Sequence, residues 1–336
     1  MHRSCFQLRL GAFAAAMLFA CGSLSAQDGG GTLSRDIVGG AALIFRKPEN
    51  PPVGGGRVTQ RRTPRPPSRA QDQMIAKGNA ARSAATPRYS EAEQQYKQAA
   101  RLDPTDARAF AGLGNVYVDQ SRFADAVEQY KQAVKLKPDY SDALIPLGYS
   151  LVRLNRYADA IATYDQAVKI DPDNPEIYNN LGFIYGHIEA YKEAIEACER
   201  AIRLLGQTGQ AYKQGYQTRN EVLSHAYKNL GNAYSGLKRY NEGAEALKRA
   251  IVVEPSNAAA HFNLGLTLYN AGRYSEAIEA YKVVAGLRPK LAPAHFNLGL
   301  TYLAINDRSA AMKEYNTLKT LDAKMAHQLY SLINDK

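Results

Sequence analysis

The feature that most constrains this chain is a pattern of residues that recurs every 34 positions, with one interruption. Six Leu-Gly pairs mark it, and their glycines are Gly114, Gly148, Gly182, Gly231, Gly265 and Gly299. Tyr or Leu follows three residues after each glycine, and a proline column recurs at Pro104, Pro138, Pro172, Pro255 and Pro289. A period of this length indicates one supersecondary unit that is copied and stacked, so that neighbours build a continuous core.

Each unit is expected to be a pair of α-helices. Residues 126–133 show apolar side chains at the helical period. Two aromatic columns, which start at Tyr89 and Tyr96, place large side chains where they fill the space between helices. The Gly and Ala columns let two helices approach closely, and each proline blocks the continuation of a helix. The aromatic columns therefore indicate a packed core rather than a cofactor site.

These columns resemble the tetratricopeptide repeat, a 34-residue helix–turn–helix unit. The resemblance covers residues 73–325 and implies an all-α fold, a right-handed α-solenoid of stacked helical hairpins. The seven predicted units are 73–106, 107–140, 141–174, 175–208, 224–257, 258–291 and 292–325, and a capping helix is predicted at 326–336.

An insertion at residues 209–223 separates the fourth unit from the fifth. Gly206 stands where the fourth unit should have its proline, and the insertion contains Tyr212 and Tyr216. It is either a local break that alters curvature or adds a contact, or a tolerated loop or helix extension.

Residues 1–26 have the three parts of a secretory signal. Arg3 and Arg9 precede an apolar run at residues 10–20, and small residues follow up to Ala26. The run is too short to span a bilayer, which takes roughly 20 apolar residues. Cleavage after Ala26 would give an exported protein, periplasmic or secreted. The alternative is acylation of Cys21, within a segment that resembles a bacterial lipobox; this would give an outer-membrane lipoprotein that contacts the membrane only through its lipid.

Residues 27–72 are rich in Pro, Gly and Arg and show no helical period. Prolines are strongly disfavoured inside helices, and the segment has too few apolar residues to offset its ordering entropy. We predict a disordered linker. Its one apolar run, residues 41–45, is either a strand that docks on the sheet edge of a partner or an unstructured patch. The basic linker either touches an anionic envelope polymer or is a solvated spacer.

The net charge of +10 does not indicate nucleic-acid binding. Residues 73–336 hold 32 basic and 28 acidic residues, so the repeats are nearly balanced. A nucleic-acid-binding domain would present a basic face. We therefore expect no nucleic-acid partner.

The sequence holds no recognisable motif for catalysis or cofactor binding. It contains no nucleophile elbow, no phosphate-binding glycine loop and no HExxH pattern. His261 and His295 lie 34 residues apart in the same local sequence. This favours copied packing residues over a metal site, because two ligands alone make a poor site. We expect no enzyme, no cofactor and no metal.

The best candidate for a binding site is a column of asparagines two residues before the glycine. Its members are Asn180, Asn229, Asn263 and Asn297. In the tetratricopeptide family this helix lines the concave surface, and an equivalent asparagine ladder grips peptide backbone in the O-linked N-acetylglucosamine transferases. The resemblance implies a groove for a protein or an extended peptide, flanked by Lys228, Phe262 and Phe296. An amide both donates and accepts, so it can hold a peptide bond from both sides. The alternative is that asparagine is simply common at a solvent-facing helix position.

Together these features predict a non-enzymatic protein–protein interaction scaffold of the cell envelope that binds a polypeptide on its concave surface. One alternative is an accessory protein that binds an envelope polymer or glycan through the basic linker. Another is a non-catalytic subunit of an enzyme complex. The sequence leaves the oligomeric state open.

Overall fold

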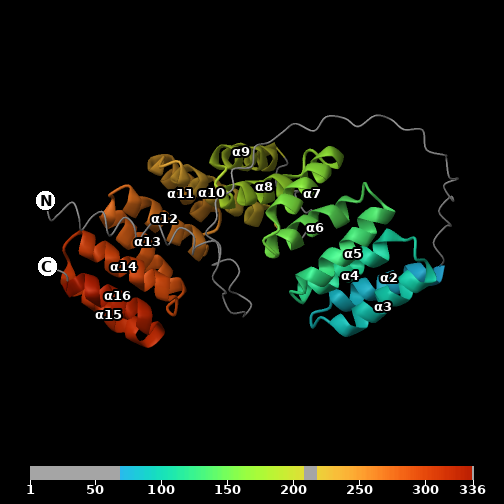
Figure 1. The fold of residues 1–336 in the computed structure, drawn as a ribbon, viewed down its shortest axis with the longest axis horizontal. Coiled ribbons are helices and arrows are strands. Elements are labelled where there is room, and N and C mark those ends of the chain that lie inside the picture. Colours follow the sequence, from blue (N-terminus) through green and yellow to red (C-terminus); the bar gives the residue numbers. More distant parts are fainter. Residues whose placement is uncertain (1–68, 208–217, 335–336) are drawn as a thin grey trace.

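The computed structural model describes residues 69–207 and 218–334, and every regular element within these ranges is an α-helix. The helices form one curved array that runs from α2 at one end to α16 at the other (Figure 1). The predicted all-α solenoid of stacked hairpins is confirmed. In chain order the helices are α2 (Arg69–Arg82), α3 (Tyr89–Leu102), α4 (Ala107–Asp119), α5 (Phe123–Leu136), α6 (Ser141–Arg153), α7 (Tyr157–Ile170), α8 (Pro175–His187), α9 (Tyr191–Gln207), α10 (Arg219–Gly236), α11 (Tyr240–Val253), α12 (Ala258–Asn270), α13 (Tyr274–Leu287), α14 (Ala292–Ala304), α15 (Arg308–Leu321) and α16 (Ala323–Asn334).

The helices pair in sequence into hairpins, from α2 with α3 to α14 with α15, and α16 packs on the last hairpin. The first helices of successive hairpins lie against one another, whereas the second helices of neighbouring hairpins hardly touch. The first helices therefore line the inner side of the curve, and the second helices form its outer side. The contact between α8 and α10 is the most extensive of those between first helices.

The closest packing within a hairpin is between a glycine on the first helix and a tyrosine on the second. A Cβ atom placed on Gly114 or Gly148 would lie 2.5 Å from the ring of Tyr130 or Tyr164. Both rings are fully buried. A methyl group would overlap the ring at this distance, so the predicted role of the glycine column in close helix approach is confirmed.

In six of the seven hairpins, from α4–α5 to α14–α15, the turn holds one residue in the left-handed region of the backbone map. Its φ is 57–63° at Ser121, Asn155, Glu189, Lys238 and Asn306, and 75° at Gly272. Each of them stands seven residues after the glycine of the column. A residue with a side chain loses roughly 1–2 kcal/mol in this conformation. The turn is nevertheless retained in all six, so the packing of the two helices outweighs this cost.

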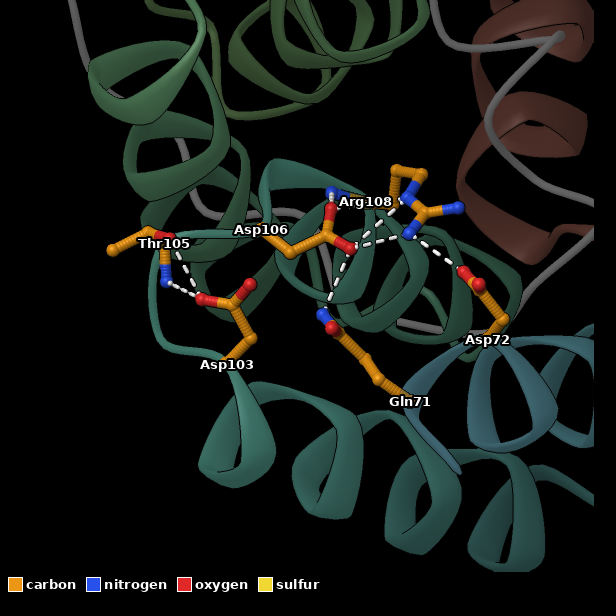
Figure 2. Close-up of polar contacts among 6 residues, drawn as sticks. All are labelled: Gln71, Asp72, Asp103, Thr105, Asp106 and Arg108. Atoms are coloured by element: carbon orange, nitrogen blue, oxygen red, sulfur yellow. Dashed lines mark hydrogen bonds and ion pairs between the residues drawn. The ribbon is translucent and has the colours of Figure 1, made fainter. Parts of the chain in front are cut away.

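Helix α2 begins at Arg69, so the last four residues of the predicted linker, 69–72, are helical. Figure 2 shows the reason: the Gln71 side-chain amide donates to Asp106 Oδ2 over 2.8 Å, and the Arg108 guanidinium bridges Asp72 and Asp106 at 2.8 and 2.7 Å. These contacts fasten the first turn of α2 to the start of α4. The periodicity of one helix cannot reveal them, because they join residues about 35 positions apart.

Two other helices also start earlier in the structure than the sequence predicted. Helix α10 starts at Arg219, where the Thr218 side chain and the Glu221 side chain form a capping box, so the predicted insertion at 209–223 ends in helix. Helix α16 starts at Ala323, three residues before the predicted capping helix, and buries Leu329 and Ile333. The predicted signal at 1–26, Cys21, linker residues 27–68 and residues 208–217 lie outside the described residues.

None of the helices in the described ranges has both the length and the apolar character that a membrane span requires.

Removing two equivalent tyrosine hydroxyls should have opposite effects on stability. The Tyr130 hydroxyl donates to Asn115 Oδ1 over 2.6 Å, so Tyr130→Phe should lower the free energy of unfolding by about 0.5–1.5 kcal/mol. The Tyr164 hydroxyl is buried without a partner in the described ranges, because Tyr149 stands where the neighbouring unit has Asn115. Tyr164→Phe should therefore cost nothing or stabilise the protein. Urea denaturation followed by circular dichroism measures both, and equal losses would contradict this account.

Two glycines with empty space around them should respond in opposite ways to alanine. Gly272 has a φ of 75°, and Gly286 lies inside α13 with ordinary helical backbone. Gly272→Ala should destabilise by about 1 kcal/mol because of the left-handed strain. Gly286→Ala should stabilise by about 0.5–1 kcal/mol because alanine loses less entropy in a helix. Thermal unfolding compares them, and a loss in both would show that local crowding decides the effect.

Candidate protein-binding surfaces

Three of the four asparagines in the predicted column lie between first helices rather than on an open surface. Asn229, Asn263 and Asn297 are only 5–8% exposed, and Asn180 is half-buried. Asn229 donates through Nδ2 to Asn179 Oδ1 over 3.1 Å, and Asn263 donates to Asn232 Oδ1 over 2.8 Å. These amides therefore satisfy each other across the packed first helices.

Asn297 shows what happens when the partner is missing. Its Nδ2 is buried and has no hydrogen-bond partner in the described part of the chain. Leu266 stands 34 residues after Asn232, at the position that accepts the bond from Asn263. The pairing thus depends on the neighbouring repeat and not on the asparagine alone.

The aromatic residues predicted to flank the groove lie in the core. Phe262 and Phe296 are 2% and 0% exposed, and Phe262 packs edge-on against Tyr281 at 5.6 Å between ring centroids. Lys228 is half-buried on α10. The structure therefore does not bring the seven predicted residues together as one accessible groove, and we correct that expectation: they are mainly packing residues.

The more open part of the inner side lies on α6 and α8 and was not predicted. We define the inner aromatic strip as Tyr149, Arg153, Phe183 and His187. Tyr149 is 36% exposed and the other three are partly exposed. Tyr149 and Phe183 each directly follow the glycine of their unit, as Asn232 does. Because Asn232 meets the next first helix, this position faces the inner side.

The inner aromatic strip is held in place by its own contacts. Arg153 donates through Nη1 to the Tyr149 hydroxyl over 2.8 Å, and its guanidinium lies 4.2 Å from the centre of the Phe123 ring. The rings of Phe183 and His187 lie 4.3 Å apart. Burial, and then the charge of Lys228, lower the pKa of His187 below its usual range. The imidazole is therefore neutral at pH 7 and adds apolar surface to the strip.

A second concave feature opens on the outer side, between α9, α10 and α11. We call it the seam pocket; its volume is about 450 Å³. Its floor is formed by Tyr227, Leu230 and Tyr234 of α10. Its walls are Glu199, Ile202 and Arg203 of α9 and Asn241, Glu242, Glu245, Ala246 and Arg249 of α11. Apolar and aromatic side chains lie at the bottom and charged ones at the rim, as in many ligand and protein docking sites.

The rim is ordered by hydrogen bonds and ion pairs. The Tyr234 hydroxyl donates to Glu199 Oε1 over 3.3 Å, and Arg203 pairs with Glu199 at 3.5 Å. Burial, and then the Glu199 charge, raise the pKa of Tyr234. Its hydroxyl therefore keeps its proton and stays a donor at neutral pH.

The seam pocket lies beside a departure from the repeat pattern. Cys198 and Leu247 stand where the other units have a tyrosine in the third aromatic column. Around Cys198 the core shrinks to a small cluster with Leu230 and Ala246, separate from the larger clusters on either side. Both side chains are fully buried against the glycine of their own unit and do not line the pocket.

The duplicated histidines have a structural role. His261 and His295 each place Nε2 3.0 Å from the carbonyl oxygen of a loop proline, Pro255 and Pro289. Tyr178, at the same position of an earlier unit, donates to the carbonyl of Pro172 over 2.8 Å. These side chains tie the loop between two hairpins to the following helix. Among the described residues no group of three or more potential ligands is placed to hold a metal ion.

Fold and surfaces together define an all-α helical-repeat protein of the kind that binds other proteins. Sequence profiles of the TPR repeat match residues 88–121, 114–155 and 148–187, and profiles of the tetratricopeptide repeat match 175–206, 228–292 and 292–325. The chain belongs to the tetratricopeptide repeat family. No curated protein sequence matches it.

Solved structures support the fold alone, because their sequence identities are low. A tetratricopeptide repeat protein from Parabacteroides merdae has a TM-score of 0.59 at 14% identity, over 80% of this chain and all of that one. PilW, a type IV pilus biogenesis factor, has a TM-score of 0.58 at 20% identity, over 68% of this chain and 98% of its own. PilF from Pseudomonas aeruginosa has a TM-score of 0.55 at 19% identity, over 68% and 98%.

The Cys198 thiol should be unreactive in the folded protein. Burial raises its pKa to about 12 from an ordinary value of 9.0. In a chain with Cys5→Ser and Cys21→Ser, a thiol reagent at pH 8 should label Cys198 only after urea is added. The unfolded thiol loses its proton above about pH 9 and the folded one does not, so stability should fall as the pH rises from 9 to 12. Cys198→Ala should make that slope shallower but not remove it, because burial also raises the pKa of tyrosines such as Tyr269, to about 12. Rapid labelling of the native protein would contradict the assignment.

Proposed function

We propose that this protein is a non-enzymatic scaffold of the cell envelope that holds a polypeptide partner against the inner side of its repeat array. The observation that carries the proposal is the inner aromatic strip, in which Tyr149, Arg153, Phe183 and His187 lie partly exposed on two adjacent first helices. Tyr and Arg are over-represented among the residues that dominate binding energy at protein interfaces.

The arrangement suits an extended or irregular polypeptide. The strip is preorganised, since Arg153 is fixed by Tyr149 and Phe123, so little side-chain entropy is lost when a partner binds. Aromatic faces take apolar or proline side chains of a partner, and the guanidinium takes a carboxylate or a backbone carbonyl. The proposed site lies on α6 and α8, in the middle of the array, whereas the predicted asparagine column runs from α8 to α14.

Export rests on the sequence of residues 1–26, with its basic start, short apolar run and small-residue end. The fold neighbours PilW and PilF share only architecture with this chain at 19–20% identity, so their role in pili is not transferred. Fractionation of the producing cell tests the location, and recovery with the cytoplasm would contradict an envelope role.

Loss of the inner aromatic strip should abolish partner capture. The full-length protein, a Tyr149→Ala and Phe183→Ala double variant and a Tyr330→Ala control would each be used as bait in envelope extract, after circular dichroism confirms equal helicity. Tyr330 is 44% exposed on the last helix, away from the strip, which makes it a matched control. Proteins retained by wild type and control but lost from the double variant are the expected result. Equal capture by all three would refute the inner site, and no capture by any would refute the scaffold.

A further inference from the structure

We propose that the seam pocket is a docking site for a segment of the chain's own N-terminal region, residues 41–47. The segment reads Ala-Ala-Leu-Ile-Phe-Arg-Lys. The proposal is independent of the partner site, because the seam pocket lies on the outer side, between α9 and α11, and shares no residue with the inner aromatic strip.

The floor of the pocket calls for an apolar occupant. Tyr227, Leu230 and Tyr234 of the floor meet the apolar wall residues Ile202 and Ala246, and the two tyrosines stand seven residues apart on one face of α10. Each Å² of apolar surface removed from water contributes about 25 cal/mol. A volume of about 450 Å³ accepts several side chains but not a whole helix. A short apolar stretch of chain therefore fits it better than a folded element.

The rim of the pocket carries charges of both signs. Five charged side chains line the pocket, and three of them are the carboxylates of Glu199, Glu242 and Glu245. Each carboxylate also meets a basic side chain close to it in the sequence, Arg203, Arg239 or Lys248. The Glu242 and Glu245 side chains are still 50% and 68% exposed, so a basic residue next to an apolar run can approach them.

The chain contains one segment with both properties outside its repeats and its first 26 residues. Residues 41–45 are the only run of five apolar side chains between residues 27 and 68, and Arg46 and Lys47 follow at once. Around it the sequence is polar, or rich in Pro and Gly. Either processing of the leader, after Ala26 or before Cys21, would leave this segment in the mature protein.

The chain between residues 41–47 and α2 is long enough for this segment to reach the seam pocket. Phe45 lies 24 positions before Arg69, where α2 begins, and an extended chain of that length spans up to about 80 Å. Helix α10 is four first-helix steps from α2. At about 10 Å between packed helices, the path is on the order of 40 Å. A segment joined to the array by so short a stretch of chain can reach millimolar effective concentration at the pocket, so even a weak contact would be populated.

Docking would shield the apolar floor of the seam pocket from water. It would also place the linker alongside the repeat array. A partner with a similar apolar and basic segment would have to displace it. The pocket is thereby a site that the chain itself regulates.

Photo-crosslinking in the full-length protein tests the contact. With p-benzoylphenylalanine in place of Phe45, irradiation should give intramolecular crosslinks to α9, α10 or α11, located by mass spectrometry of the monomer band. The same group in place of Val58 is the control and should give none there. A Glu242→Lys and Glu245→Lys double variant, which leaves the floor intact, should lose the crosslink.

A second measurement avoids the unnatural group. In the full-length protein, Ile44→Ser with Phe45→Ser should speed amide hydrogen exchange in α9–α11 and leave α12–α16 unchanged. Crosslinks to the inner side, crosslinks between two copies that grow with concentration, or unchanged exchange in both regions would each overturn the proposal. None of these results bears on the inner aromatic strip, whose test uses other residues.

Discussion

The close approach of the two helices in each hairpin is the constraint on which the rest of the structure depends. At Gly114, Gly148 and Gly265 a tyrosine ring from the second helix lies where a Cβ atom would be. The same glycine column meets Cys198 and Leu247 in two other hairpins, and all of these hairpins share the left-handed turn residue between their helices. The hairpins then stack with first helices inside and second helices outside. A methyl group at the glycine would push the ring into its neighbours, because a packed core has no room to relax.

The seam pocket and the inner aromatic strip both lie where the repeat pattern of the sequence changes. The third aromatic column is interrupted at Cys198 and Leu247, and the seam pocket opens between the helices that carry them. The same junction has lost its proline at Gly206, and α10 begins inside the predicted insertion at 209–223. The inner aromatic strip is another departure: Tyr149 and Phe183 replace the asparagine found at the same position in Asn115 and Asn232. The Tyr149 replacement leaves the Tyr164 hydroxyl without a partner and puts an exposed ring on the inner side.

The asparagine column shows why the site was harder to predict than the fold. Its spacing correctly marks the first helices, but spacing does not say whether a polar side chain meets water or another helix. Asn229 and Asn263 point at amides of the preceding repeat, and Asn297 does so without an acceptor. Phe262 was expected beside a groove, yet the ring is buried against Tyr281. Each of these outcomes depends on residues 19–50 positions away, on another helix.

Sequence alone determined the class of fold, the length of the repeat, the close glycine contact and the structural role of the duplicated histidines. All of these follow from periodicity, which is a local property copied along the chain. Only the tertiary structure decided which face of each first helix is covered, that α2 starts at Arg69 through its bonds to the next hairpin, and that a pocket opens between α9, α10 and α11. These properties come from contacts between neighbouring repeats, and the free energy of such a contact depends on both partners and on the angle at which the hairpins stack.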